Sequence, residues 1–156
     1  MASSLPIFCA VWAKLEKGDF SNSILTNLPG WEGIMGLQFE NLVVHNRKTV
    51  WRLLGISPEE VVMDGPFFQK PTRRQPGCQI DYMIQTRFQN LYLCEVKFSK
   101  NRIDKKVIEE MEEKRTRLKM PRQFSIRPIL IHVNGIEDSI LDEGYFDKVI
   151  DFSQLL

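Results

Sequence analysis

Two runs of sequence decide the fold of this chain: QIDYMI at residues 79–84 and LYLCEVK at residues 91–97. Both contain the β-branched and aromatic residues that favour strands, and the segment around Phe88-Gln89-Asn90 favours a short turn between them. We therefore expect two strands, over residues 78–86 and 91–98, that pair as an antiparallel hairpin.

The second of these strands carries charge on an apolar face. Side chains of a strand alternate between its two faces, so Glu95 and Lys97 share a face with Leu91 and Leu93. Charged groups there are costly unless they are paired or bind a metal ion. The pattern therefore indicates a functional role for Glu95 and Lys97.

The length of the hairpin loop decides whether Asp81 joins them. A three-residue loop with Thr86 paired to Asn90 puts Asp81 opposite Glu95 on the same face. A two-residue loop puts the two carboxylates on opposite faces. A site built from both residues therefore requires an odd loop length.

Two carboxylates and a lysine on adjacent strands favour one kind of chemistry. Neighbouring carboxylates repel one another unless a divalent cation holds them, and hard oxygen ligands select Mg²⁺ or Mn²⁺. Such an ion polarises a phosphoryl oxygen and acidifies a bound water. A neighbouring lysine positions or deprotonates that water, or stabilises charge on the phosphate. The set Asp81, Glu95 and Lys97 thus predicts phosphodiester hydrolysis.

Asp81 followed by Glu95-Val96-Lys97 resembles the signature of the PD-(D/E)xK, or restriction-endonuclease-like, nuclease superfamily. The resemblance implies a three-layer α/β/α sandwich with a mixed central sheet, preceded here by short N-terminal helices. It implies that Asp81 and Glu95 bind the metal and that Lys97 assists the water. Glu40 on the preceding helix would complete the catalytic and metal-binding set, and the carbonyl of Val96 would be a further ligand.

The wider layout resembles the nuclease-like C-terminal domain of archaeal-type AAA+/STAND ATPases. Three segments carry this likeness, at residues 36–43, 77–81 and 95–99, and residues 15–20 and 145–152 also fit. No GxxxxGK[ST] motif occurs in the chain. The resemblance therefore implies a free-standing relative or a detached C-terminal domain, and an ATPase as one partner.

The remaining pattern predicts helices on both faces of one sheet. Apolar spacings of three, four and seven predict a helix over residues 31–54, ended by Gly55. Asp104 is a suitable N-cap for a helix to about Leu118. We expect strands at 61–63, 67–70, 126–133 and 148–151, a turn at 64–66 and a loop at 71–77. Residues 31–156 form one domain, and residues 1–30 form a helical extension packed on it.

Composition limits the function classes. With 156 residues, 43% of them hydrophobic, the chain fits one globular domain. The net charge is only +1, so nucleic acid must be bound by local basic clusters. The chain shows no signal peptide or membrane-spanning run, and its three cysteines lack zinc-like spacing, which indicates reduced thiols in the cytoplasm and no membrane partner. The residues expected to bind nucleic acid are Arg73, Arg74, Lys100, Arg102, Lys106 and Arg115.

The sequence is compatible with two functions. The first is a Mg²⁺- or Mn²⁺-dependent endonuclease acting on DNA, to which the helix after the signature adds a further polar residue, Lys106, Lys114 or Arg115. The second is a catalytically inactive nuclease-like module that binds nucleic acid or docks an ATPase or an identical copy. A homodimer is compatible with both.

Overall fold

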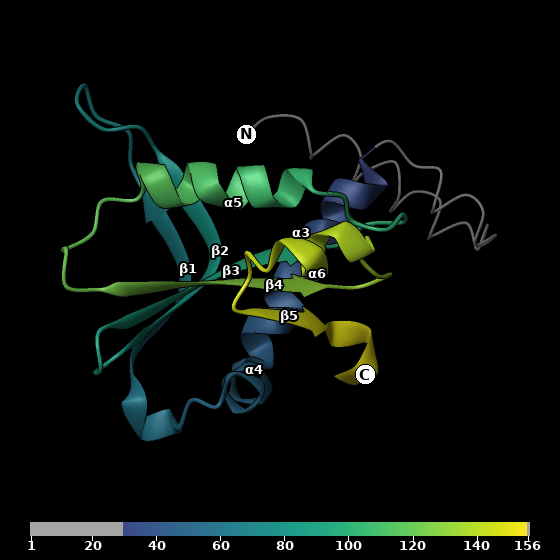
Figure 1. Cartoon of the computed structure of the whole chain (residues 1–156), viewed down its shortest axis with the longest axis horizontal. Coiled ribbons are helices and arrows are strands. Elements are labelled where there is room, and N and C mark those ends of the chain that lie inside the picture. Colours follow the sequence, from purple (N-terminus) through teal and green to yellow (C-terminus); the bar gives the residue numbers. More distant parts are fainter. Residues whose placement is uncertain (1–29, 156) are drawn as a thin grey trace, which may run out of the picture. The chain divides into compact units, whose positions relative to one another are not determined.

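The computed structural model describes residues 30–155 (Figure 1). The chain divides into two compact units, Met1–Met35 and Gly36–Leu156, and the second contains the whole sheet. The predicted extension over residues 1–30 lies almost wholly outside the described residues. Within residues 30–155, none of the helices combines the length and apolar character needed to cross a lipid bilayer.

The described chain begins with two helices and a 3-10 turn, continues with three consecutive strands, and alternates between helices and strands only after them. In order, the elements are α3 (Trp31–His45), α4 (Arg47–Leu54), the 3-10 turn η1 (Pro58–Glu60), β1 (Val61–Gln69), β2 (Cys78–Thr86), β3 (Asn90–Lys97), α5 (Lys106–Arg117), β4 (Ser125–His132), α6 (Asp138–Glu143), β5 (Lys148–Asp151) and the 3-10 turn η2 (Phe152–Leu155).

The five strands form one mixed sheet in the order β1-β2-β3-β4-β5. The first three strands are antiparallel, whereas β3, β4 and β5 run parallel. In Figure 1, α5 and α6 lie on one side of the sheet and α4 on the other. The predicted α/β/α sandwich with a mixed central sheet is confirmed.

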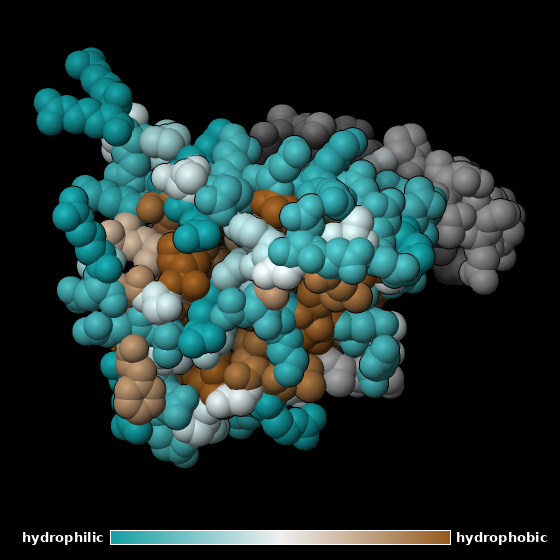
Figure 2. Space-filling view, viewed as in Figure 1, coloured by the Kyte–Doolittle hydropathy of each residue, from teal (hydrophilic) through white to brown (hydrophobic). Residues whose placement is uncertain are grey.

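Each face of the sheet has its own apolar core. Phe39 and Val43 of α3 and Trp51 of α4 pack with Tyr82 and Val96 on one face. On the other face, the buried residues of α5 and α6 pack against those of the sheet, among them Val107, Met111, Ile140, Leu93 and Leu130. Apolar side chains also show at the surface in separate patches between hydrophilic ones (Figure 2).

The hairpin has the loop length that a common face requires. β2 ends at Thr86 and β3 begins at Asn90, which leaves a three-residue loop, and the N–H of Gln89 donates to the carbonyl of Thr86 at 3.1 Å. Gln89 has a left-handed φ of 61°. The register pairs Tyr82 with Cys94 and Met83 with Leu93, so its continuation puts Asp81 opposite Glu95, as predicted.

The predicted turn at residues 64–66 is wrong, because β1 runs unbroken from Val61 to Gln69. The register shifts instead between Gly65, paired with Met83, and Phe67, paired with Ile80. Pro66 therefore faces two residues of β2, in the manner of a β-bulge. Proline fits there since it has no N–H to give to a ladder.

The predicted single helix over residues 31–54 is also wrong, because it breaks at Asn46 into α3 and α4. The side-chain Nδ2 of Asn46 donates to the carbonyl of Leu42 at 2.8 Å. A side chain that bonds its own backbone competes with regular helix geometry. The predicted end at Gly55 is confirmed by its left-handed φ of 70°.

Candidate active site

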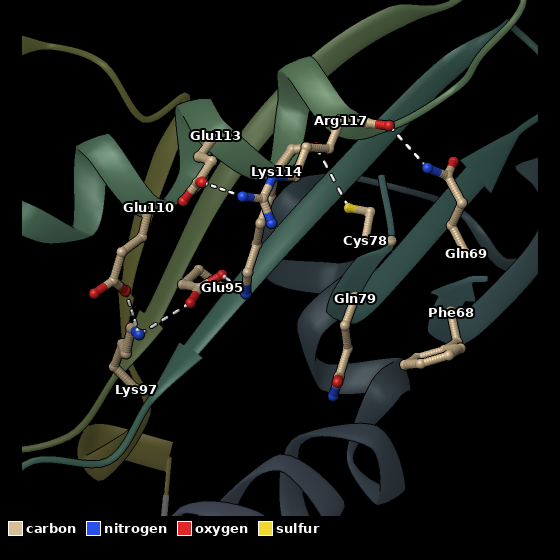
Figure 3. Close-up of a pocket in the computed structure, with 11 residues that line it drawn as sticks. Phe68, Gln69, Cys78, Gln79, Glu95, Lys97, Glu110, Glu113, Lys114 and Arg117 are labelled. Carbon is tan, nitrogen blue, oxygen red and sulfur yellow. Dashed lines mark hydrogen bonds and ion pairs between the residues drawn. The ribbon is translucent and has the colours of Figure 1, made fainter. Parts of the chain in front are cut away.

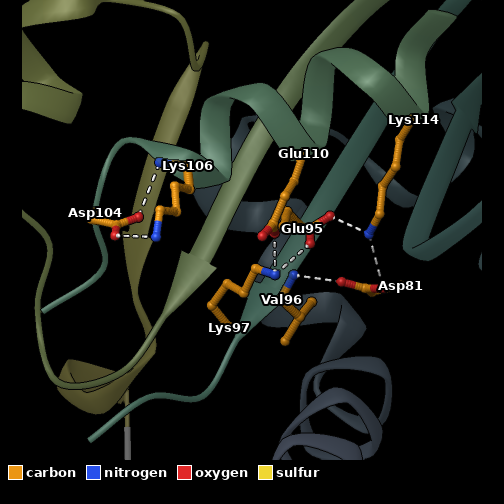
Figure 4. A network of polar contacts seen from close by, with 8 residues as sticks. All are labelled: Asp81, Glu95, Val96, Lys97, Asp104, Lys106, Glu110 and Lys114. Carbon is orange, nitrogen blue, oxygen red and sulfur yellow. Dashed lines mark hydrogen bonds and ion pairs between the residues drawn. The ribbon is translucent and has the colours of Figure 1, made fainter. Parts of the chain in front are cut away.

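The carboxylates of Asp81 and Glu95 meet beneath α5, where Lys114 joins them (Figure 4). Asp81 is 8% and Glu95 2% exposed. The Nζ of Lys114 lies 3.5 Å from Oδ1 of Asp81 and 2.5 Å from Oε2 of Glu95. The two buried carboxylates thus share the ammonium of Lys114, which offsets part of the cost of burying their charges.

β2 and β3 stop pairing at this point, and the side chain of Asp81 accepts a backbone hydrogen bond in place of the neighbouring strand. Tyr82 and Cys94 are the pair nearest the site in the ladder of β2 and β3. Beyond them, the backbone N–H of Val96 donates to Oδ2 of Asp81 at 2.9 Å. The carboxylate is therefore held by one oxygen while the other faces Lys114.

Lys97 lies on the same side and contacts two acids. Its Nζ is 3.1 Å from Oε1 of Glu95 and 2.6 Å from Oε2 of Glu110 on α5. Burial lowers the pKa of Lys97, but the hydrogen bond to Glu110 and the charge of Glu95 outweigh it, so the pKa lies above its usual value. Lys97 is therefore an ammonium ion at neutral pH.

Lys114 is also held in its charged form. Burial lowers its pKa, and the charges of Glu95 and Asp81 more than offset that effect, so the pKa is raised. The site without a metal therefore contains two ammonium groups beside two buried carboxylates.

Glu40 lies on α3 within electrostatic range of the site. Burial raises the pKa of its carboxyl, and the negative charge of Asp81 raises it further, while Lys114 acts in the opposite direction. Over residues 30–155, however, no three histidine, cysteine, aspartate or glutamate side chains are grouped closely enough to hold a metal ion. Glu40 is thus a neighbour of the carboxylate pair, not part of a preformed triad.

The pair itself fits a divalent cation. Both carboxylates are hard oxygen donors, and both approach one point, the Nζ of Lys114. Mg²⁺ commonly uses one or two carboxylates and fills its other positions with water and substrate phosphate. Asp81 and Glu95 therefore meet the chemical requirement, provided that Lys114 moves away.

The site lies between two hollows along α5. The larger, of about 400 Å³, extends toward β1 and includes Phe68, Gln79 and Arg117 in its lining (Figure 3). The other, of about 330 Å³, extends toward the loop before α5. Lys97 and Glu110 line both. A polymer that crosses the site along α5 would therefore meet both hollows.

The six basic residues predicted to bind nucleic acid do not form one patch. Arg102 and Lys106 line the smaller hollow. Arg73 and Arg74 are exposed on the loop between β1 and β2, and Lys100 is exposed on the loop after β3. Arg115 lines neither hollow and pairs with Glu112 at 3.3 Å.

Among the three helix residues left open by the sequence, the structure brings Lys114 to the carboxylates. Lys114 follows the buried residues Val107 and Met111 by seven and three positions. This helical spacing is a signal that could have singled out Lys114, although the sequence analysis left the three residues open. Glu110 was not predicted, and no pattern distinguished it from its acidic neighbours.

No protein-family model and no curated protein matches the sequence. Among solved structures, the chain is similar to a repair endonuclease from Pyrococcus abyssi, with a TM-score of 0.45 and 17% sequence identity. The match covers 71% of this chain and 43% of that one. The chain thus spans less than half the length of that endonuclease.

Proposed function

We propose that this chain is a metal-dependent nuclease that hydrolyses phosphodiester bonds of DNA. The observation that carries the proposal is the convergence of two buried carboxylates, Asp81 and Glu95, on a single cation, with the ammonium of Lys97 at 3.1 Å from Glu95. A cluster of charged groups whose lysine pKa values are perturbed and which borders an open cavity is a candidate functional site.

In this proposal Asp81 and Glu95 hold Mg²⁺ or Mn²⁺, with Glu40 near it and the Val96 carbonyl as a further ligand. The ion, when bound, supplies Lewis acidity toward a phosphoryl oxygen and a more acidic water. Lys97 orients the attacking water and stabilises negative charge on the phosphate, since it is protonated. Lys114 leaves the carboxylates and binds a phosphate oxygen.

A specific observation also favours the non-catalytic alternative. The ammonium groups of Lys114 and Lys97 already compensate the charges of Asp81 and Glu95 without a metal. In a nuclease-like module that only binds nucleic acid or a protein, this ion pair would be structural. Binding of a partner would then be independent of metal.

A measurement of metal binding distinguishes the nuclease from the non-catalytic module. We would titrate Mn²⁺ by calorimetry into the wild-type chain, the double variant Asp81→Asn, Glu95→Gln, and Glu109→Gln on the exposed side of α5 as control. The nuclease proposal expects binding that the double variant loses and the control keeps, followed by Mg²⁺-dependent cleavage of DNA. Absence of metal binding with DNA present would contradict it and support the module.

Partners beyond nucleic acid rest on the sequence resemblance. We propose a separate ATPase and a second copy of this chain as further partners. Sedimentation of the purified chain tests the second directly. A monomer at all concentrations would argue against a dimer that cuts both strands together.

A further inference from the structure

The loop between β1 and β2 is a short arm that projects from the sheet (Figure 1). Thr72 and Gln75 form an antiparallel bridge, in which the N–H of Thr72 donates to the carbonyl of Gln75 at 2.8 Å and the N–H of Gln75 donates to that of Thr72 at 3.4 Å. The bridge leaves Arg73 and Arg74 at the tip, where both residues are exposed. Figure 2 shows the projecting arm as hydrophilic atoms. The fold thus presents two guanidinium groups outside the body of the domain.

The charge of this tip is not compensated. Within residues 30–155, neither Arg73 nor Arg74 forms an ion pair. By contrast, Arg102, Lys106 and Arg115 each pair with an acid of the chain. Uncompensated cations create a positive potential that attracts anionic partners. The two arginines of the arm are therefore better placed to bind an anion than the other basic residues predicted to do so.

The side chain of Gln69 fixes the base of the arm to the end of α5. Its Nε2 donates to the carbonyl of Arg117 at 2.8 Å and to that of Pro76 at 2.9 Å. Its Oε1 accepts the backbone N–H of Lys119 at 2.9 Å. The arm and the loop between α5 and β4 therefore lie side by side at one end of the domain.

The two segments that meet at this end contain no acidic residue. Asp and Glu are absent from residues 65–80 and from residues 114–136. Besides the tip, the exposed cations of the arm and the α5–β4 loop are Lys70, Lys119 and Arg122. The net charge of the whole chain is only +1, so this local excess of positive charge is the clustering that nucleic-acid binding requires.

This basic end is continuous with the candidate site. Gln69 and Gly77, at the base of the arm, line the larger hollow together with Glu95 and Lys97. A polymer with one phosphate at Glu95 can therefore follow the hollow to the arm. The arm would then contact the same polymer beyond the scissile phosphate.

We propose that the arm over residues 70–77 and the adjoining α5–β4 loop bind double-stranded DNA, with Arg73 and Arg74 against the phosphates of a groove. The major groove of B-DNA is wide enough for a two-stranded β-ribbon. The arm contains no aromatic residue, whereas single-strand binding relies on aromatic side chains that stack on bases. The inference rests on the proposed function, which supplies DNA as the polymer, and it names a duplex as the substrate class.

Binding measurements on the full chain test the arm separately from catalysis. Fluorescence anisotropy with a labelled DNA duplex, the matching DNA single strand and an RNA duplex of the same sequence is measured in EDTA over a range of salt concentrations. We compare the wild type with the double variants Arg73→Ala, Arg74→Ala and Arg73→Lys, Arg74→Lys. The control is Lys48→Ala, Arg52→Ala, which removes two exposed cations from α4 on the face of the sheet opposite α5. Urea denaturation of each variant verifies that the fold is kept.

The alanine variant of the arm should bind the DNA duplex at least about tenfold more weakly, and the slope of log affinity against log salt should fall by about two, one for each cation removed. The lysine variant should keep the slope, and the α4 control should keep both slope and affinity.

Four outcomes overturn the duplex-binding arm: no binding by the wild type, unchanged affinity in the alanine variant, an equal loss in the α4 control, or tighter binding of the single strand or of the RNA duplex. Cleavage of DNA in Mg²⁺ by the same wild-type chain leaves the nuclease proposal standing in each of these cases. Loss of duplex binding in the alanine variant of a chain that cleaves nothing in Mg²⁺ supports the arm and overturns the nuclease.

Discussion

The carboxylate of Asp81 accepts the backbone N–H of Val96 at 2.9 Å, beyond the point where β2 and β3 stop pairing. A backbone donor that would otherwise bond to the neighbouring strand is thus satisfied by a side chain, and Val96 is only 6% exposed. Buried N–H groups need a partner. Asp81 therefore has a structural task as well as the proposed metal-binding one, and substitutions can separate the two.

We expect Asp81→Asn to keep the fold and lose the metal. An asparagine carbonyl can still accept the N–H of Val96, but it lacks the negative charge that a divalent cation needs. Asp81→Ala leaves the N–H unsatisfied and should lower the free energy of unfolding by about 1–3 kcal/mol more than Asp81→Asn does. Urea denaturation and Mn²⁺ calorimetry measure the two effects. Wild-type metal affinity in Asp81→Asn would show that the carboxylate is not a ligand.

Lys114→Met should tighten metal binding, because the ammonium competes with the cation for Asp81 and Glu95. We expect the Kd for Mn²⁺ to fall about tenfold. Without metal, Asp81 loses the ammonium of Lys114 and Glu95 keeps only that of Lys97, so the free energy of unfolding should fall by about 3 kcal/mol. Lys106→Met, an exposed lysine on the same helix, is the control. Weaker Mn²⁺ binding in Lys114→Met would mean that the lysine supports the metal and does not replace it.

Much of the fold could be predicted because it follows from local periodicity. The alternation of residues 91–97 put Glu95 and Lys97 on one face, whereas Asp81 joined them only on the condition of an odd loop length, which the structure meets. The predicted strand near residues 148–151 is confirmed as β5. The continuity of β1 through Pro66 could not be predicted, since a bulge depends on the strand opposite it.

The candidate site could be predicted only where its residues follow a strand pattern. Lys114 and Glu110 reach the site from α5, twelve or more residues beyond Lys97, and their contacts depend on how that helix crosses the sheet. An acidic run such as residues 109–113 fits a solvated helix face equally well. The sequence therefore could not distinguish Glu110, which contacts Lys97, from Glu113, which contacts Arg117.

Glu110→Gln should lower the pKa of Lys97. The hydrogen bond and charge of Glu110 hold that pKa above its usual value, and in the variant Glu95 alone remains to oppose the effect of burial. Titration of the lysine side-chain amines by NMR measures the shift, and the alkaline limb of any pH–activity profile should move to lower pH with it. Glu113→Gln is matched in charge and helix but contacts Arg117, so it should leave Lys97 unchanged. An identical Lys97 titration in both variants would refute the assignment.

Tyr82→Phe should destabilise the fold on the face of the sheet opposite α5. The Tyr82 hydroxyl accepts the indole N–H of Trp51 at 2.9 Å and donates to Oδ2 of Asp64 at 2.8 Å. Its removal leaves two partners unsatisfied around a fully buried position, which costs about 1–3 kcal/mol. Tyr145→Phe removes an exposed hydrogen bond to Glu112 and should cost less than about 1 kcal/mol. If both variants lost the same free energy of unfolding, the burial of the Tyr82 hydrogen bonds would not add to their contribution.

His132 should make the fold sensitive to acid. It is 4% exposed, its Nδ1 has no hydrogen-bond partner among the described residues, and burial lowers its pKa below the usual 6.5, although Asp151 opposes this. The unfolded chain therefore binds the proton more tightly than the folded one. The stability that neutral His132 gives is present above pH 6.5 and is lost as the pH falls from 6.5 toward the lower folded-state pKa. Urea denaturation across this window should show a slope that His132→Leu flattens, while His45→Leu at an exposed position keeps it. An unchanged slope in His132→Leu would assign the acid sensitivity to the carboxylates.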